Sequence, residues 1–207
     1  MATLVQPASD VRPLPLILRL EAVTELSDDQ FYELCRRNRD LRIERTAKGD
    51  LIIMSPAGGR SGNRSAHILF QLQRWAREDG TGVAFDSSTG FVLPNGAIRA
   101  PDVSWVRRTR LAALSSEQKE KFLPLAPDFV AELRSPSDSP AALAEKLQEY
   151  VSNGTALGLL IDPYEKRVTS LRTGQPAETL IAPSLVACDP VLSGFVLDLS
   201  EIWEVGW

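Results

Sequence analysis

Residues 127–163, PDFVAELRSPSDSPAALAEKLQEYVSNGTALGLLIDP, predict two buried strands joined by a helix. The first eight and the last eight residues of this stretch are mostly apolar, which suits the inside of a sheet. Residues 139–154 between them read as a helix, with Ser139 at the cap, Pro140 at the first helical position and Gly154 at the exit. Neighbouring strands joined through a helix form a parallel crossover, which places the chain in the α/β class.

The first of these strands carries two charged residues that are unusual in a buried strand. Glu132 and Arg134 lie two residues apart, and side chains in a strand alternate between its faces, so Val130, Glu132 and Arg134 point the same way. A buried charge costs several kcal/mol unless it is compensated, so these charges indicate more than scaffolding. This face of the strand is therefore the first candidate for a functional site.

Two Pro-Asp pairs offer a second carboxylate beside Glu132. Asp128 lies on the same face of the same strand, but four residues of strand separate the two Cα atoms by roughly 13 Å. One divalent ion holds carboxylate oxygens at about 2.0–2.6 Å, so Asp128 and Glu132 are poorly placed to share it. Asp102, in AIRAPDVSWV (97–106), belongs to the preceding strand, and adjacent strands lie ~4.8 Å apart. Asp102 and Glu132 can therefore converge if the register permits, and we interpret Asp128 as a strand-entry residue.

The helix at 139–154 brings a lysine to the same place. Its apolar stripe on a helical wheel consists of Leu143, Leu147, Tyr150 and Val151. Lys146 stands at the edge of that stripe, so we expect its ammonium group to reach back over the sheet towards Glu132. The alternative is a solvated helix lysine whose stem packs past the tyrosine.

The rest of the chain supplies further strands and helices around this core. We expect loose order at 1–20, a helix at 27–38, a hairpin at 41–56, a glycine-rich loop at 57–62, a helix at 63–78, a strand at 82–87, two strands within 90–106, a helical insertion at 107–124 and a strand at 166–172. The predicted core is α-β-β-β-α-β, a mixed sheet flanked by helices, with an extra N-terminal helix and β-hairpin. We predict an N-terminal extension at 1–23 and a single domain at 24–207.

Composition and charge argue against several classes of protein. The 207 residues suit one domain, and a net charge of −4 does not indicate a strongly basic nucleic-acid-binding face. Cys35 and Cys188 are far apart and His67 is the single histidine, so a zinc site of Cys and His is not expected. We expect both cysteines to pack as small buried groups in a reducing cytoplasm. The apolar runs are too short to span a bilayer, and the first twenty residues do not have the pattern of a secretion signal.

The charged residues and their surroundings resemble a known group of enzymes. Their order along the chain resembles the PD-(D/E)XK nuclease superfamily: Pro101-Asp102, then Glu132-Leu133-Arg134, then Lys146. The segments LIIMSPAGG, GNR, FDSSTGF, APDVSWV, PDFVAELRSPSDS, EKLQEY and VLSGFVLDLSEIW resemble, in order, the Uma-two family of restriction-endonuclease-like proteins. This resemblance covers residues 24–204, and the long string of segments in order is specific for the family.

The resemblance implies a restriction-endonuclease-like fold and a mechanism. Asp102 and Glu132, with the backbone carbonyl of Leu133, would hold Mg²⁺ (or Mn²⁺), which polarises a phosphodiester and lowers the pKa of a bound water. Lys146 would take the role of the superfamily lysine, and Arg134 would steady the phosphate or the attacking water. The partner would be nucleic acid, expected to be DNA, and the protein would be a cytoplasmic endonuclease that forms a homodimer.

Three questions stay open at this point. Arg134 occupies the usual lysine position and an arginine cannot act as a general base, so a catalytically silent nucleic-acid or protein-binding module with the nuclease fold is the second hypothesis. A third hypothesis is a structural or oligomerisation protein whose charged cluster is a salt-bridge network. Glu44, in LRIER (41–45), stands where the family has an acid; it is either an additional residue of the same cleft or a surface glutamate paired with an arginine.

Overall fold

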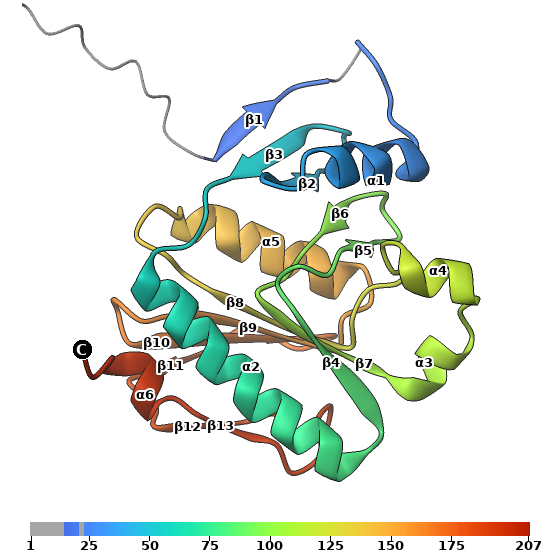
Figure 1. Cartoon of the computed structure of the whole chain (residues 1–207). Coiled ribbons are helices and arrows are strands. Elements are labelled where there is room, and N and C mark those ends of the chain that lie inside the picture. The colour runs from blue at the N-terminus through green and yellow to red at the C-terminus, as the bar shows by residue number, and fades with distance from the viewer. Residues whose placement is uncertain (1–14, 21–22) are drawn as a thin grey trace, which may run out of the picture.

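The computed structural model describes residues 15–20 and 23–207 (Figure 1). At its centre is the predicted crossover, in which β8 (Phe129–Leu133) and β9 (Leu157–Asp162) are parallel neighbours and α5 (Pro140–Ser152) connects them. Apolar side chains fill both strands, and β8 is buried along its whole length. The parallel crossover inferred from the sequence is therefore confirmed.

The crossover belongs to a six-stranded sheet with the order β11-β10-β9-β8-β7-β4. The other strands of this sheet are β4 (Gly82–Asp86), β7 (Val103–Arg107), β10 (Arg167–Arg172) and β11 (Glu178–Ile181). Every neighbouring pair except β8–β9 is antiparallel, so the sheet is mixed. Together with α2 (Gly59–Asp79), this layer runs α2-β4-β7-β8-α5-β9, and the predicted α-β-β-β-α-β core is confirmed.

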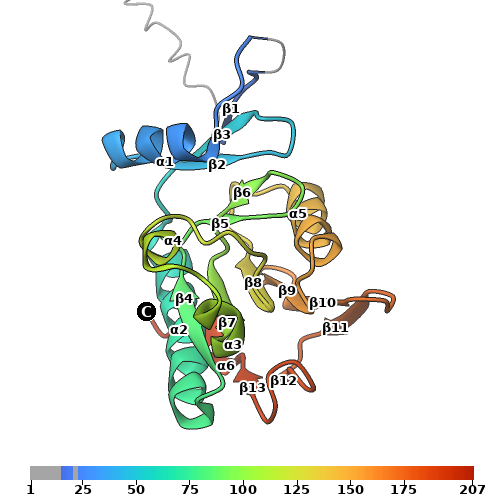
Figure 2. The same ribbon diagram turned by 90° about the vertical axis from the view of Figure 1, so that its right-hand side faces the viewer.

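Helices cover both faces of this sheet, α2 on one side and α5 on the other (Figure 2). Phe129 and Leu133 of β8 share a buried cluster with Leu72 of α2. Val130 instead packs in a second cluster with Leu147 of α5. Since side chains in a strand alternate between faces, the one acid of β8 lies on the α5 side.

The C-terminal segment packs against α2. Two strands, β12 (Leu185–Ala187) and β13 (Val196–Asp198), form a small separate sheet, and α6 (Ser200–Trp203) follows. Ile202 of α6 and Leu197 of β13 belong to the same buried cluster as α2. The C-terminal part therefore closes the α2 face of the large sheet and leaves the α5 face to other elements.

A second sheet, with the order β1-β3-β2-β6-β5, lies at the top of Figure 1. Its strands are β1 (Leu16–Leu18), β2 (Arg42–Arg45), β3 (Leu51–Met54), β5 (Phe91–Val92) and β6 (Ile98–Arg99). The predicted hairpin is β2–β3, and the predicted helix beside it is α1 (Asp28–Arg37), which begins with the expected capping box of Ser27 and Gln30. Arg45 pairs with Ile98, so the hairpin is joined to the segment that leads into β7.

Residues 90–106 form three short strands, not the two expected from the sequence. The strands are β5, β6 and β7, and the last two are separated at Pro101. Proline has no backbone N–H and cannot continue a ladder of hydrogen bonds. Asp102 therefore stands just before β7, outside either strand.

The glycine-rich loop predicted at 57–62 is also wrong in part, because α2 begins at Gly59. Glycine is a poor helix former, so tertiary contacts must compensate. Ser61 is buried, and a Cβ at Gly59 would lie 3.3 Å from the ring of Trp207, so the C-terminal residues pack closely on this first turn. The helix expected at 63–78 is accordingly one turn longer at its start.

Two further expectations concern the ends of the domain and the insertion. The loose order expected at residues 1–20 can be compared with the structure at residues 15–20, since 1–14 lie outside the described residues, as do 21–22. Within residues 15–20, β1 is an ordered strand that pairs with β3 along its whole length. The boundary predicted between residues 23 and 24 stays a prediction. The helical insertion is confirmed as α3 (Arg108–Ala112) and α4 (Ser116–Glu120).

Candidate active site

Asp102 and Glu132 are brought together by the pairing of β7 with β8. Val103 lies opposite Ala131 in this antiparallel pair, so the next residues outward, Asp102 and Glu132, are opposite each other. The backbone N–H of Leu133 donates to Oδ2 of Asp102 at 2.9 Å, which fixes the aspartate across the end of the two strands. The register is therefore the one that convergence of these two carboxylates requires.

Asp128 lies at the other end of β8. Its carboxylate accepts a hydrogen bond from the backbone N–H of Arg107 at 3.0 Å and forms an ion pair with Arg110 at 3.1 Å. These contacts fasten the strand entry to β7 and α3. The interpretation of Asp128 as a strand-entry residue agrees with this position.

Lys146 reaches the carboxylates from α5. Its Nζ lies 2.8 Å from Oε1 of Glu132 and 2.9 Å from Oε1 of Glu44. The adjacent Leu147 packs directly over Gly158 of β9, where a Cβ would lie 2.5 Å from the leucine Cδ1. Because Gly158 has no side chain, α5 approaches the sheet closely and Lys146 meets the acid of β8.

Glu44 comes from β2 and is almost fully buried. Besides Lys146, it accepts a hydrogen bond from the backbone N–H of Ala100 at 3.1 Å and forms an ion pair with Arg99 at 3.1 Å. Arg99 continues to Glu149 of α5, with 2.6 Å between Nε and Oε2. The glutamate of the hairpin is thus a saturated member of the cluster and ties β2, β6 and α5 together.

Arg134 lies just past the end of β8 and turns to β9. Its NH1 lies 2.8 Å from Oδ2 of Asp162, and its guanidinium stands 5.5 Å from the centre of the Tyr164 ring. Among the residues that the structure describes, the ion pairs of Arg134 do not include Glu132. The guanidinium is therefore placed beside the carboxylate cluster and engaged by another partner.

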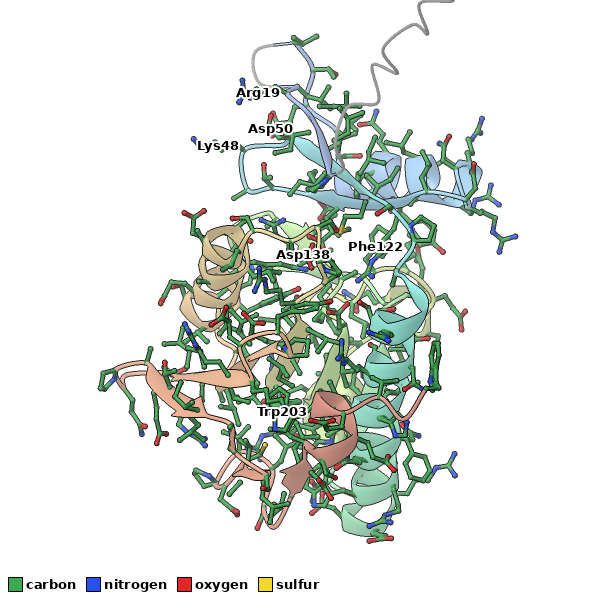
Figure 3. The ribbon with its side chains drawn as sticks, turned by 90° about the vertical axis from the view of Figure 1, so that its left-hand side faces the viewer. Arg19, Lys48, Asp50, Phe122, Asp138 and Trp203 are labelled. Carbon is green, nitrogen blue, oxygen red and sulfur yellow. The ribbon has the colours of Figure 1, made fainter. Side chains whose placement is uncertain are left out.

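Figure 3 looks at this end of the sheet, where Asp138 of the loop after β8 lies below the layer that carries Lys48 and Asp50.

Sequence reasoning missed Arg42 and Arg99. Arg42 of β2 donates to the carbonyl of Ala100 at 3.0 Å and reaches within 3.5 Å of Oδ1 of Asp102. A signal for Arg42 was present, because it stands two residues before Glu44 in the hairpin and therefore shares its face. For Arg99, the partner Glu149 is fifty residues away, and no local pattern indicates that contact.

Burial and the neighbouring charges act differently on the two glutamates. Burial raises the pKa of Glu132 to about 7; Lys146 opposes this rise, and the charges of Asp102 and Glu44 add to it. Burial also opposes ionisation of Glu44, but Lys146 and Arg99 outweigh it and hold the pKa of Glu44 below its usual value. At Glu132, therefore, the nearby lysine does not fully offset the effect of burial, whereas at Glu44 the two cations do.

Lys146 and Tyr150 complete the electrostatics of the site. Burial opposes the charge of Lys146, but the two glutamates outweigh it and raise the lysine pKa, so the ammonium form is favoured. Burial raises the pKa of Tyr150 well above its usual value, and the charges of Glu132 and Glu44 add to the shift. The hydroxyl of Tyr150 is buried without a hydrogen-bond partner among the described residues. It therefore lies protonated beside the two carboxylates.

The donor groups fit a hard divalent cation. Asp102 and Glu132 offer carboxylate oxygens, the ligands that Mg²⁺ and Mn²⁺ prefer. The backbone N–H of Leu133 points at Asp102. Because the N–H and C=O of one strand residue point to the same neighbouring strand, the carbonyl of Leu133 also points towards the strand that follows Asp102. In the described part of the chain, His, Cys, Asp and Glu do not gather in a metal-binding group of three or more. Water would have to complete the coordination, as it usually does for Mg²⁺.

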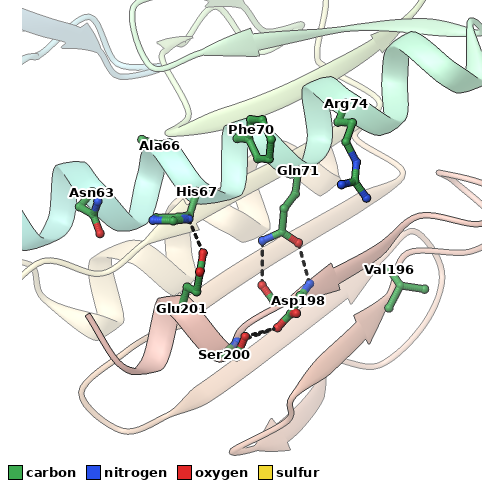
Figure 4. Close-up of a pocket in the computed structure, with 10 residues that line it drawn as sticks. All are labelled: Asn63, Ala66, His67, Phe70, Gln71, Arg74, Val196, Asp198, Ser200 and Glu201. Atoms are coloured by element: carbon green, nitrogen blue, oxygen red, sulfur yellow. Dashed lines mark hydrogen bonds and ion pairs between the residues drawn. The ribbon is translucent and has the colours of Figure 1, made fainter. Parts of the chain in front are cut away.

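A groove on the opposite side of the sheet contains the histidine (Figure 4). It lies between α2, β13 and α6 and has a volume of about 610 Å³. His67 Nδ1 stands 2.7 Å from Oε2 of Glu201, and Gln71 exchanges hydrogen bonds with the backbone of Asp198. The carboxylate cluster does not line this groove, so His67 is separate from the candidate site.

The order of helices and strands is that of a restriction-endonuclease-like α/β protein, and comparison with known proteins agrees. The Uma2 family, described as "Putative restriction endonuclease", matches residues 28–200, and the chain belongs to this family. A crystal structure described as that of "a putative nuclease belonging to DUF820" from Anabaena variabilis is similar in fold. Its TM-score is 0.71 and its sequence identity 21%, over 86% of this chain and 97% of that chain. Among curated proteins, none matches. The family and the fold inferred from the sequence are confirmed.

No helix in the described ranges is long and apolar enough to cross a membrane.

Both cysteines are free; Cys188 is buried and Cys35 is half-buried, as expected of packing residues. Burial raises the pKa of Cys35 to about 11 and that of Cys188 to about 12, so both favour the thiol form.

Proposed function

We propose that this chain is a nuclease that hydrolyses phosphodiester bonds in DNA and depends on Mg²⁺. The observation that carries the proposal is the cluster of Asp102, Glu132 and Lys146 at one end of the sheet, in a member of the Uma2 family. A buried carboxylate with a raised pKa and a cationic partner is a typical mark of a functional site. Membership of a family described as "Putative restriction endonuclease" favours nucleic acid as the substrate.

Asp102, Glu132 and the carbonyl of Leu133 would hold the metal ion. When bound, such an ion polarises the phosphodiester and lowers the pKa of a water molecule. Glu132 must be ionised to act as a ligand. Because its pKa is about 7, it is mostly ionised only above that pH, and its buried charge then favours binding of a cation. Lys146 stays protonated beside two carboxylates, so its role is to stabilise negative charge on the phosphate and not to remove a proton from water.

The charges of the cluster fit an anionic substrate once a cation is present. The ion pairs of the cluster join three cations, Lys146, Arg42 and Arg99, to four carboxylates, Glu44, Asp102, Glu132 and Glu149. The negative excess would repel a phosphodiester. A divalent ion would reverse that excess and make the site attractive to the phosphate group.

Calorimetric titration of Mn²⁺ and Mg²⁺ tests the proposal without knowledge of the substrate. We expect the wild type to bind and both Asp102→Ala and Glu132→Ala to lose binding. Asp128→Ala is the matched control, because it removes a carboxylate from the same strand at its far end. Equal binding by all four proteins, or binding by none, contradicts the proposed site. Incubation of supercoiled DNA, linear DNA and RNA with Mg²⁺, with and without EDTA, then identifies the substrate.

A second candidate function is a catalytically silent binding module. The observation that favours it is the arginine at the superfamily's lysine position, which is held by Asp162 and Tyr164 away from Glu132. Such a protein would bind DNA equally well with and without Mg²⁺ and would never cleave it. Cleavage that disappears in Glu132→Gln would exclude this alternative.

We also propose that the protein is cytoplasmic, in keeping with its two free cysteines, and that it forms a homodimer, as the family resemblance implies. Trp203 is engaged within the chain, where its Nε1 donates to the carbonyl of Pro183 at 2.7 Å. Trp207 is largely exposed and is the better candidate for a contact between subunits. Sedimentation equilibrium of the wild type and Trp207→Ala tests this proposal; a monomeric wild type would contradict it.

A further inference from the structure

Arg42 is the arginine that enters the carboxylate cluster from the N-terminal hairpin. Its guanidinium bonds the carbonyl of Ala100, two residues before Asp102, and lies 3.5 Å from the aspartate itself. Three carboxylates act on it: although burial opposes the charge, Asp102, Glu44 and Glu132 together raise the pKa of Arg42. The side chain therefore belongs to the site electrostatically, although it comes from a strand of the other sheet.

The cluster has one open end, and Arg42 stands there. The side chains of Glu44 and Glu132 are each 3% exposed, whereas that of Asp102 is 22% and that of Arg42 34% exposed. A phosphodiester is carried on a bulky polymer and cannot enter between the two buried glutamates. A substrate that approaches from solvent must therefore meet Asp102 and Arg42 first.

The other cations of the neighbourhood are already engaged. Lys146 lies between two carboxylates, and Arg99 bridges Glu44 and Glu149. Arg134 is paired with Asp162 at 2.8 Å. Arg42, in contrast, has a single carboxylate at the long distance of 3.5 Å. Among the described residues the buried Nε atoms of Arg42 and Arg134 both have no hydrogen-bond partner, so the weak carboxylate contact is what sets Arg42 apart. Of these four cations, Arg42 is the one held most weakly by a carboxylate and the one most exposed to solvent.

We propose that Arg42 binds a non-bridging oxygen of the substrate phosphodiester, so that the N-terminal hairpin forms part of the active site. This inference rests on the proposed function. A guanidinium offers several donors in a planar fork that matches a phosphate group. Once a cation neutralises Asp102, the carboxylate no longer holds Arg42, and the phosphate takes its place as the anionic partner. The role that the sequence suggested for Arg134 then falls to a residue of β2.

The proposal predicts opposite effects on two kinds of ligand. Removing the positive charge beside Asp102 should tighten Mn²⁺ binding about threefold or more, because a competing cation is lost. The same change should weaken binding of an oligonucleotide about tenfold, the effect of losing one charge-assisted hydrogen bond. A merely structural arginine would not produce this pair of opposite shifts.

The experiment compares the wild type with Arg42→Gln, Arg42→Lys and the control Arg37→Ala. Arg37 is exposed on α1, so its removal changes the net charge of the same layer outside the site. Mn²⁺ affinity is measured by calorimetry, and affinity for a fluorescent DNA duplex by anisotropy in Ca²⁺, with the duplex checked by gel for integrity. Arg42→Gln should show both shifts and Arg37→Ala neither. Arg42→Lys, which keeps the charge but not the fork, should weaken the duplex about threefold at unchanged Mn²⁺ affinity.

Failure of this inference is distinguishable from failure of the proposed function. If the wild type binds Mn²⁺ and DNA, and Arg42→Gln binds both equally well, Arg42 is not the phosphate ligand while the nuclease proposal stands. The same conclusion follows if Arg134→Ala loses DNA binding and Arg42→Gln keeps it. If the wild type binds neither ligand, the proposed function has failed and the role of Arg42 fails with it. Should Arg42→Gln not fold, Arg42→Lys carries the comparison.

Discussion

Lys146 and Glu132 form a buried ion pair, with 2.8 Å between Nζ and Oε1. Glu44 holds the other side of the same ammonium group at 2.9 Å. One lysine therefore compensates two buried carboxylates that come from different sheets. This arrangement makes Lys146 important for folding as well as for the proposed chemistry, and the two roles can be separated by experiment.

Lys146→Met should destabilise the protein by about 3–5 kcal/mol, since it leaves buried carboxylates without a cation. Glu132 would then be protonated more easily, and Glu44 would retain Arg99 as its one ion-pair partner among the described residues. Urea unfolding at pH 8 measures the change. Adding Glu132→Gln to Lys146→Met should recover part of the loss, because one of the two uncompensated charges is removed. Wild-type stability in the single variant would show that the ion pair contributes nothing.

Stability should also depend on the protonation of Glu132. Burial raises its pKa from 4.5 to about 7 in the folded protein, so between these values the folded state binds the proton more tightly than the unfolded state. The free energy of unfolding therefore falls as pH rises from 4.5 to 7, by up to about 3 kcal/mol from this group. Above pH 7 the effect is complete.

The difference between wild type and Glu132→Gln isolates this contribution, because other titrating groups are common to both proteins. Urea unfolding from pH 4.5 to 8 should show the wild type losing stability relative to the variant as pH rises. Saturating Mn²⁺ should oppose the loss in the wild type alone, since the ion binds the ionised carboxylate. A difference that is flat with pH would mean that Glu132 titrates normally.

Restoring the superfamily lysine at position 134 should not improve the site. Asp162 and Tyr164 hold this side chain beside β9, and a lysine there would find the same carboxylate. We expect Arg134→Lys to leave Mn²⁺ affinity unchanged and to lower stability by about 1 kcal/mol through the weaker contacts with Asp162 and the ring. Calorimetry and urea unfolding measure the two effects. A tenfold gain in DNA cleavage would contradict this prediction and would assign the role of the superfamily lysine to position 134 instead of Lys146.

Much of the site followed from local patterns in the sequence. Alternation in β8 put Val130 and Glu132 on one face, and the helical wheel put Lys146 at the edge of the stripe that meets that face. Antiparallel neighbours allowed Asp102 to meet Glu132, and the observed register does bring them opposite each other. The positions of Val130, Glu132 and Lys146 depend on short-range periodicity, which sequence reports well. The register that brings Asp102 opposite Glu132 came from the structure.

The contacts that sequence reasoning missed depend on register between distant elements. Arg134 meets Asp162 because β8 and β9 pair in parallel with Glu132 beside Leu160, and apolar runs do not fix that offset. Arg42 meets Asp102 because the hairpin joins β6, where Arg45 of β2 pairs with Ile98, 53 residues further along the chain. Long-range pairing of this kind has no local signature. The sequence places Arg42 on the same face as Glu44, but its contact with Asp102 came only from the structure.

Gly158→Ala should disturb the site through packing alone. The added Cβ would lie 2.5 Å from Cδ1 of Leu147, closer than real contacts allow, so α5 or the leucine must move. We expect a loss of about 1–3 kcal/mol, the usual cost of overpacking a core. Because Lys146 precedes Leu147, the same displacement should lengthen its contact with Glu132. Urea unfolding measures the first effect. A longer contact lets the pKa of Glu132 rise further, because Lys146 opposes the rise less. The stability difference between Gly158→Ala and the double variant Gly158→Ala with Glu132→Gln should therefore change at a higher pH than the same difference in the wild-type background.

The control is Gly62→Ala in α2, where a Cβ has open space and the helix gains a better former. This change should leave stability equal or raise it slightly. Leu147→Ala combined with Gly158→Ala should cost less than the sum of the two single changes, because removal of the leucine side chain relieves the clash. Additive losses would mean that α5 does not depend on the missing side chain of Gly158, and that another contact positions Lys146.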